Sequence, residues 1–124
     1  MEPLSQKKII LIVDDDVDLL ENTAFLIKSA GYDVIMAQNG AEAVNKYKET
    51  SPNLVLMDIR MPILDGYDAF FKIKQFDPNA KVILITAYAH DEKKHIKAKS
   101  LNLIDTISKP YTIEHLEEAI AKYS

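Results

Sequence analysis

The stretch that decides the fold runs from Asn53 to Gly66 and reads NLVLMDIRMPILDG. Four apolar residues, Leu54 to Met57, lead directly into Asp58, and a proline and an Asp-Gly pair then interrupt the chain. A short unbroken apolar run is typical of a strand buried on both faces, as in a parallel sheet. We therefore expect Asp58 at the carboxyl end of such a strand, where open α/β sheets bind their ligands.

The composition is that of one globular domain, which we expect to span residues 1–124. Apolar residues make up 48% and charged residues 27%, a balance that argues against disorder. The net charge of −4 disfavours general nucleic-acid binding, which needs a basic surface. The absence of cysteine excludes disulfides and thiolate metal sites, and no apolar run is long enough for a membrane span or a signal peptide. The sequence therefore predicts a cytoplasmic domain without membrane contact.

Strand-like apolar runs alternate with helical patterns along the whole chain. The expected strands are 9–13, 34–37, 54–57, 82–85 and 104–108. The first expected helix starts at Val17 and stops at Gly31. The next three cover 41–49, 67–76 and 91–101, and the last runs from a Thr112 cap to Tyr123. This five-fold alternation predicts an α/β fold with a parallel sheet, and right-handed crossovers bring all strand carboxyl ends to one edge.

Polar side chains follow four of the five expected strands at that edge. They are Asp14, Asp15 and Asp16 after the first strand, Asp58 after the third, Thr86 after the fourth and Lys109 after the fifth. One Asp is enough to cap a helix, and Asp16 is the expected cap. The remaining carboxylates repel one another, and Mg²⁺, which prefers oxygen ligands, relieves that repulsion.

A hydroxyl and an ammonium beside such a metal site complete a set suited to phosphoryl transfer. Lys109 can pair with a carboxylate or a phosphoryl group, and the Thr86 hydroxyl can donate to a phosphoryl oxygen. In this chemistry positioning and charge neutralisation supply most of the catalysis. Asp58 stands alone on its strand and is therefore the best candidate nucleophile, forming an aspartyl phosphate.

Taken together and in this order, these residues resemble the receiver domain of the bacterial two-component response-regulator family over roughly residues 7 to 123. The motifs that carry the resemblance are Asp14-Asp15, LMDIRMPILDG around Asp58, Thr86-Ala87 and Lys109-Pro110. The resemblance implies a doubly wound, flavodoxin-like fold with five helices and strand order 2-1-3-4-5.

The resemblance also implies roles for the residues at the strand ends. Asp58 accepts a phosphoryl group from a phosphohistidine on a sensor histidine kinase or histidine phosphotransfer protein. Mg²⁺ binds directly to Asp15, Asp58 and the backbone carbonyl of Arg60, and through water to Asp14. The expected family features further include phosphoryl contacts from Thr86 and Lys109 and a cis Lys109-Pro110 bond.

Four further residues occupy switch and tuning positions of the resembled family: Arg60, Ala87, Tyr88 and Thr106. The bulky side chains of Arg60 and Tyr88 suggest a shielded, longer-lived phosphoryl group. Thr106 stands where the family usually carries an aromatic residue that swings inward. A rotating-ring switch is therefore not expected in this chain.

Two helices carry possible interaction features. Phe25 falls on the polar arc of the first helix, where receivers of this kind dock a partner, and we expect it to contact the phosphodonor. The helix over 91–101 is lysine-rich with only Ile96, Ala98 and Leu101 to anchor it, which predicts low local stability. Asp65-Gly66 is interpreted as a turn. The histidines at 90, 95 and 115 are expected to be solvated.

The leading interpretation is a stand-alone receiver that is not an enzyme in the usual sense and acts by protein contact. It is either a phosphorelay intermediate that hands its phosphoryl group on or a signal that binds a target, and one domain of a longer chain is also compatible with the sequence. The alternative is a small Mg²⁺-dependent phosphatase with an aspartyl-phosphate intermediate, whose motif needs Thr or Val where this chain has Asp18. A flavin-binding flavodoxin-like module is a third possibility. It needs a Gly- and hydroxyl-rich phosphate loop where this chain has three acids.

Overall fold

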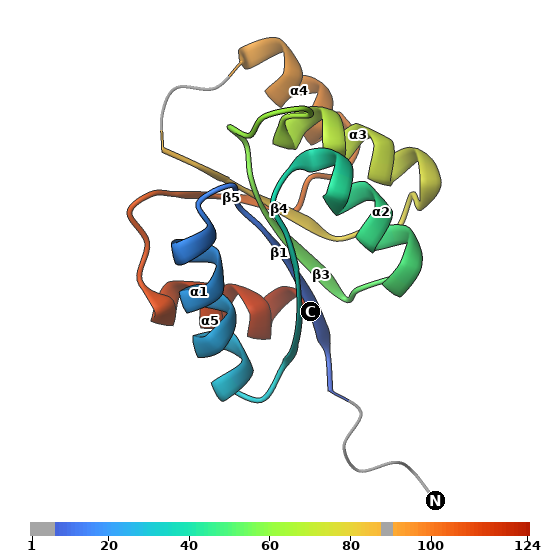
Figure 1. Ribbon diagram of the computed structural model, residues 1–124. Helices are drawn as coiled ribbons and strands as arrows, with labels where there is room; N and C mark the ends of the chain where they lie inside the picture. Colours follow the sequence, from blue (N-terminus) through green and yellow to red (C-terminus); the bar gives the residue numbers. More distant parts are fainter. Residues whose placement is uncertain (1–6, 88–90) are drawn as a thin grey trace, which may run out of the picture.

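Strands and helices alternate throughout the computed structural model, which describes residues 7–87 and 91–124 (Figure 1). The strands are β1 (Ile9–Val13), β2 (Asp33–Ala37), β3 (Leu54–Asp58), β4 (Val82–Thr86) and β5 (Asp105–Ser108). The helices are α1 (Val17–Ser29), α2 (Gly40–Thr50), α3 (Gly66–Phe76), α4 (Glu92–Ser100) and α5 (Ile113–Tyr123). The predicted alternation is confirmed, with boundaries that differ from the expected ones by one or two residues.

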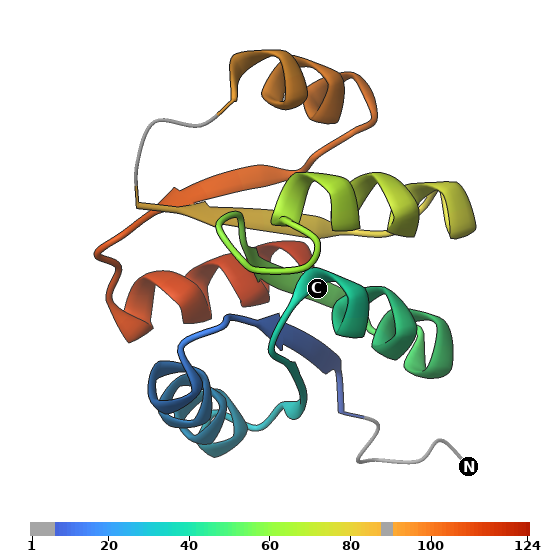
Figure 2. The ribbon, with the colours of Figure 1, turned by 45° about the horizontal axis from the view of Figure 1, so that its top comes forward.

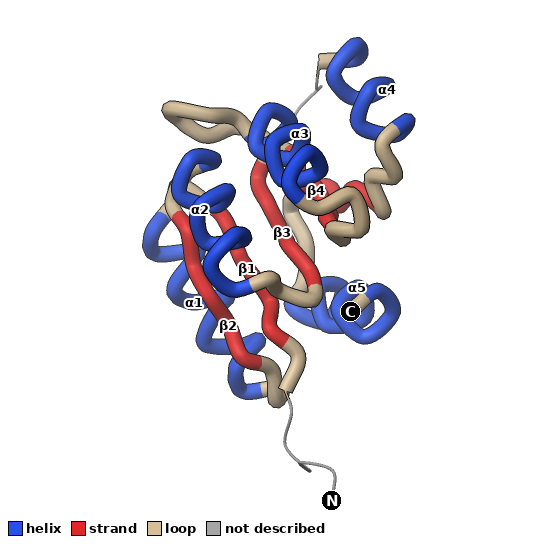
Figure 3. The backbone as a smooth tube through the Cα atoms, turned by 90° about the vertical axis from the view of Figure 1, so that its right-hand side faces the viewer, coloured by secondary structure: helices blue, strands red, loops and turns tan. Residues whose placement is uncertain are grey.

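The strands form one parallel sheet in the order β2-β1-β3-β4-β5 (Figure 3), which confirms the fold class. Asp58 at the end of β3 pairs with Ile85 of β4, and Thr86 at the end of β4 pairs with Ser108 of β5. This register aligns the carboxyl ends of the central strands at one edge of the sheet. Lys109 follows directly at the same edge.

Helices α2, α3 and α4 cover one face of the sheet, and α1 and α5 cover the other (Figure 1 and Figure 2). Alternate residues of a strand point to opposite faces, so β1, β3 and β4 each contribute to two separate hydrophobic clusters. Leu11, Val55 and Leu84 pack in the cluster under α2, α3 and α4, whereas Ile10 and Leu56 pack in the cluster under α1 and α5. Burial on both faces explains why the strands read as unbroken apolar runs.

Polar side chains cap the helices and fix where each one begins. The carboxylate of Asp16 accepts from the backbone N–H of Leu19 at 3.2 Å, and the Thr112 hydroxyl accepts from the N–H of His115 at 3.1 Å. Both predicted caps are confirmed. Gly31, just beyond the end of α1, has φ +106°, a conformation that glycine adopts without strain.

Within the described ranges, every helix falls short of the length and apolar character needed to cross a bilayer.

Candidate functional site

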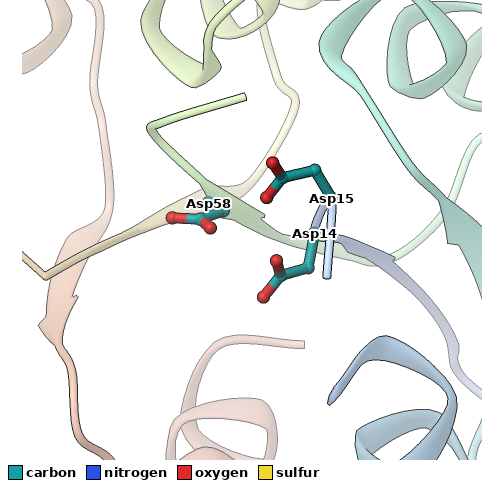
Figure 4. Close-up of side chains that lie close together, drawn as sticks. All are labelled: Asp14, Asp15 and Asp58. Atoms are coloured by element: carbon teal, nitrogen blue, oxygen red, sulfur yellow. The ribbon is translucent and has the colours of Figure 1, made fainter. Parts of the chain in front are cut away.

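Three carboxylates from two neighbouring strands converge at the predicted edge of the sheet (Figure 4). Asp14 and Asp15 follow β1, and Asp58 ends β3. One oxygen from each of the three lies within 4.8 Å of the other two. Asp14 and Asp58 are buried, whereas Asp15 is exposed to solvent. The predicted convergence of these acids is confirmed.

The ammonium group of Lys109 joins this cluster from the loop after β5. Its Nζ lies 3.1 Å from Oδ2 of Asp58 and 3.4 Å from Oδ2 of Asp14. The backbone N–H of Lys109 donates to the carbonyl of Thr86 at 2.8 Å, which ties the loop to the end of β4. The Lys109-Pro110 peptide bond is cis, as expected. One positive charge therefore faces three negative ones.

Burial and crowding shift the ionisation of this cluster. Burial raises the pKa of the Asp58 carboxyl, and the charges of Asp14 and Asp15 add to that rise. The hydrogen bond and charge of Lys109 oppose the rise without cancelling it. Burial lowers the pKa of Lys109, but its contacts with Asp58 and Asp14 raise it on balance. The site therefore favours binding of additional positive charge.

The donor set fits Mg²⁺. All three side chains offer carboxylate oxygens, which are the hard ligands that this ion prefers, and the cluster lacks the nitrogen and sulfur ligands that favour zinc. Their negative charge exceeds the single charge of Lys109. Asp15 and Arg60 also line an adjoining cavity of about 620 Å³, which leaves room for the waters that Mg²⁺ retains.

Thr86 lies at the same edge of the sheet, one residue after Ile85, which is the strand partner of Asp58. It is half-buried, and Ala87 after it is exposed. Ala87 lines a second cavity of about 380 Å³ together with Leu19, Lys109 and Tyr111. Tyr88, the other predicted tuning residue on this segment, lies outside the described residues. The roles of these side chains toward a phosphoryl group stay predictions.

Tyr111 is a residue of this site that the sequence interpretation missed. Its phenol interacts with the side chain of Thr23, which is buried on α1, and burial raises the pKa of that phenol. This interaction relates the loop that carries Lys109 to α1. Thr23 shares the buried face of α1 with Leu20, Ala24 and Ile27, and a hydroxyl on an apolar face needs a partner, which was the available signal.

The interpretation of Asp65-Gly66 as a turn was incomplete. The carboxylate of Asp65 caps α3 by accepting from the N–H of Asp68 at 2.8 Å, and it also binds Lys94 of α4 at 3.0 Å. A Cβ at Gly66 would collide with the backbone carbonyl of Asp58. Glycine is therefore required beside the candidate acceptor, because any other side chain would displace the end of β3.

The prediction that His95 is solvated was wrong. Its Nδ1 lies 3.0 Å from the hydroxyl of the buried Tyr67, so α4 is joined to α3 by this bond. His115 is exposed, as expected, and His90 lies outside the described residues. Of the three apolar residues expected to anchor α4, Ile96 is 68% and Leu101 39% exposed, and the low local stability of this helix stays a prediction. In that helix only Ala98 is buried among the described residues.

Two other predicted residues occupy exposed positions. Phe25 on α1 is 67% exposed, so it lies on the outward face as expected, and its contact with a donor stays a prediction. Thr106 on β5 is also exposed, and its backbone N–H donates to the carboxylate of Asp105 at 2.8 Å. Its role in a conformational switch stays a prediction as well.

Known proteins resemble this chain over nearly its whole length. A family profile described as the response regulator receiver domain matches residues 10–121. The chemotaxis protein CheY of Thermotoga maritima is 42% identical over 94% of this chain and 98% of its own.

Solved structures with the same fold include a CheY-like response regulator receiver domain protein from Methanospirillum hungatei. It has a TM-score of 0.88 at 32% identity and covers 94% of this chain and 93% of its own. The CheX-CheY-BeF3-Mg complex from Borrelia burgdorferi has a TM-score of 0.82 at 31% identity and covers 93% of this chain and 87% of that one.

Proposed function

Since the chain belongs to the response-regulator receiver-domain family of two-component signal transduction, we propose that Asp58 accepts a phosphoryl group from a phosphohistidine on a partner protein. The observation that carries this proposal is the contact of Lys109 with both Asp58 and Asp14. This contact of Lys109 brings the ends of β1, β3 and β5 together around the Asp58 carboxylate.

The proposed step exchanges one bond to phosphorus for another. A carboxylate oxygen of Asp58 forms a new bond to phosphorus, and the bond between phosphorus and the donor imidazole nitrogen breaks. The bonding electrons stay on the released imidazole. Lys109 sits 3.1 Å from the Asp58 carboxylate, so its charge is already placed to stabilise the phosphoryl oxygens without rearrangement.

Mg²⁺ is the proposed cofactor, held by Asp15 and Asp58, by the backbone carbonyl of Arg60 and, through water, by Asp14. When bound, the ion supplies positive charge that offsets both the carboxylate cluster and the incoming phosphoryl group. The burial of Asp14 and Asp58 supports this assignment, because buried carboxylates need a counter-charge beyond the single ammonium nearby.

Thr86 is proposed to donate its hydroxyl to a phosphoryl oxygen. Support comes from the register, which places Thr86 one position past the strand partner of Asp58, and from the hydrogen bond between its carbonyl and the N–H of Lys109. The two groups that face the phosphoryl oxygens are thereby fixed to each other through the backbone.

The proposed partners are a histidine kinase or histidine phosphotransfer protein as donor and a second protein as target. Phe25, exposed on α1, supports a donor surface on that helix. The solved complex of a similar CheY with CheX, formed with Mg and BeF3, supports output by protein contact. In this proposal the domain promotes only its own phosphorylation and slow dephosphorylation.

The test is an intact-mass measurement after incubation with acetyl phosphate, with and without Mg²⁺, for the wild type and Asp58→Asn. We expect one added phosphoryl group on the wild type with Mg²⁺, and none on the variant or after chelation. Continuous turnover of a small phosphate ester, with no stable phosphoprotein, would instead support the alternative of a Mg²⁺-dependent phosphatase.

A further inference from the structure

Ile63 occupies an unusual backbone position in the loop between β3 and α3. The N–H of Leu64 donates to the carbonyl of Pro62 at 2.7 Å, closing a three-residue turn around Ile63, whose φ is +72°. Such turns are strained, and a β-branched side chain at positive φ adds to the strain. The side chain is 80% exposed, so burial does not compensate. Backbone strain of this kind clusters at functional sites.

The loop around this turn is held at both ends, so the turn cannot relax by moving. The N–H of Gly40 at the start of α2 donates to the carbonyl of Leu64 at 3.2 Å, and the N–H of Gly66 donates to the carbonyl of Ile59 at 2.7 Å. A Cβ at Gly40 would collide with the Leu64 carbonyl. Figure 3 shows the loop projecting past the first turns of α2 and α3. Ile63 is therefore presented to solvent at a fixed place.

Ile63 forms the rim of a cavity of about 340 Å³ that we name the α2–α3 groove. Val44 and Leu64 line it with apolar side chains, and the exposed residues Lys48 and Lys72 line it as well. The Lys48 ammonium lies 5.5 Å from the centroid of the Phe76 ring. The described lining residues include no carboxylate. Neither lysine has an ion-pair partner within residues 7–87 and 91–124. The groove thus combines an exposed apolar side chain with two unneutralised positive charges.

We propose that the α2–α3 groove binds an amphipathic helix of a partner protein, one that presents an apolar side chain to Ile63 and carboxylates to Lys48 and Lys72. A groove flanked by two helices suits a helical ligand, because its apolar stripe fills the groove while its polar flanks meet the rim. The two lysines select an acidic partner over a basic one. The residues that line this groove include none of the acidic cluster, Thr86 or Lys109.

The first test asks whether Ile63 stabilises the fold or contributes to a binding surface. Asparagine adopts positive φ with less strain than isoleucine, so Ile63→Asn should raise the melting temperature by a few degrees. A fall in melting temperature would show that Ile63 stabilises the fold, and would overturn the proposal.

The second test uses a synthetic helical peptide with a leucine stripe flanked by glutamates, and a matched peptide with lysines in their place. Backbone amide NMR shifts should change along α2 and around Ile63 with the glutamate peptide only. Lys48→Glu combined with Lys72→Glu should weaken binding at least tenfold, by loss of two charge contacts. Lys93→Glu with Lys99→Glu, an equal charge change on α4, should not.

Each other outcome contradicts the proposal. Binding of the lysine peptide with equal affinity, shifts centred on another surface, or no shifts at millimolar peptide would show that the groove does not select an acidic helix. Shifts at the same amides that grow with protein concentration alone would assign the groove to a second copy of this chain. All of these measurements can be repeated on Asp58→Asn, so they stay independent of the phosphoacceptor proposal.

Discussion

Nζ of Lys109 lies 3.1 Å from Oδ2 of Asp58, although the two residues are 51 positions apart in the chain. The lysine comes from the loop after β5, and the aspartate ends β3. Strand β4 lies between them in the sheet, so the contact spans the edge where the strand ends meet. This contact is the basis for the predictions about phosphoryl transfer.

Removing the ammonium should separate metal binding from phosphoryl transfer. Lys109→Gln keeps a polar side chain but leaves Asp58 and Asp14 without their positive partner. We expect phosphorylation by acetyl phosphate to slow roughly 100-fold, as is typical when one transition-state donor is lost. Mg²⁺ should bind at least as tightly, because the carboxylates lose a competing cation. Lys93→Gln on the exposed face of α4 is the matched control, and equal slowing in both variants would exclude the proposed role.

Asp58→Asn should stabilise the metal-free protein. The fold raises the pKa of Asp58, chiefly by burial, so the folded state holds the proton more tightly than the unfolded chain. Ionisation of Asp58 therefore costs stability as the pH rises from the unfolded pKa through the folded pKa, and the full cost applies above the folded pKa. We expect urea denaturation at pH 7 without Mg²⁺ to show a gain of about 1 kcal/mol in the variant.

The same experiment at acid pH provides the control. Below 3.8, the value of the unfolded carboxyl, wild type and Asp58→Asn should have equal stability. Saturating Mg²⁺ should stabilise the wild type more than the variant at pH 7, because the ion binds only the folded state with the full carboxylate set. A variant less stable than the wild type at neutral pH would contradict this assignment.

Arg60 and Tyr88 are predicted to slow loss of the phosphoryl group by shielding it. Arg60 is exposed and lines the cavity that Asp15 borders. Trimming both residues to alanine should speed hydrolysis of the aspartyl phosphate roughly tenfold, because attacking water gains access. The rate is measured by the decay of the phosphorylated mass after removal of acetyl phosphate. An unchanged decay rate would refute the shielding hypothesis.

Lys94 should govern how often α4 opens. It binds Asp65 at 3.0 Å and Asp68 at 3.1 Å, and Ala98 is the one buried residue of the described helix. Lys94→Ala should therefore accelerate amide hydrogen exchange in α4 several-fold while exchange in the sheet stays unchanged. Global stability should fall by less than about 1 kcal/mol, because these pairs are partly exposed. Faster exchange throughout the protein, or the same effect from Lys93→Ala, would argue against this local role.

Phe25 is predicted to contact the phosphodonor. Phe25→Ala should slow phosphotransfer from a histidine phosphotransfer protein roughly tenfold, by loss of exposed apolar surface from the interface. Phosphorylation by acetyl phosphate needs no docking, so that rate should not change. Phe76→Ala removes an equally large exposed ring at the end of α3 and serves as the control. Unaltered transfer to Phe25→Ala would rule out this contact.

The order of elements and the convergence of acids could be predicted from local patterns. Unbroken apolar runs mark the strands because both sheet faces are covered, and parallel connections place every strand end at one edge. Asp14, Asp15, Asp58 and Lys109 were therefore predictable as a group. The strand order and the cis Lys109-Pro110 bond were expected only through the family resemblance.

Contacts between helices could not be predicted in the same way. The bond of His95 to Tyr67 and the pairing of Lys94 with Asp65 join α3 to α4, and no periodicity specifies which polar residues of two helices meet. The positive φ of Ile63 was equally hidden, because isoleucine ordinarily predicts extended backbone. Each of these features depends on tertiary packing that overrides local preference.

The central claim is that Asp15, Asp58, Thr86 and Lys109 converge on one ligand at the sheet edge. The most direct measurement is a crystal structure grown with Mg²⁺ and beryllium fluoride, whose beryllium becomes tetrahedral when it binds a carboxylate oxygen and so occupies the phosphoryl position. We expect the anion on Asp58, contacted by Thr86 Oγ1 and Lys109 Nζ, with Mg²⁺ between Asp15 and Asp58. An anion bound elsewhere, or one beyond hydrogen-bond distance of either Thr86 or Lys109, would contradict this claim.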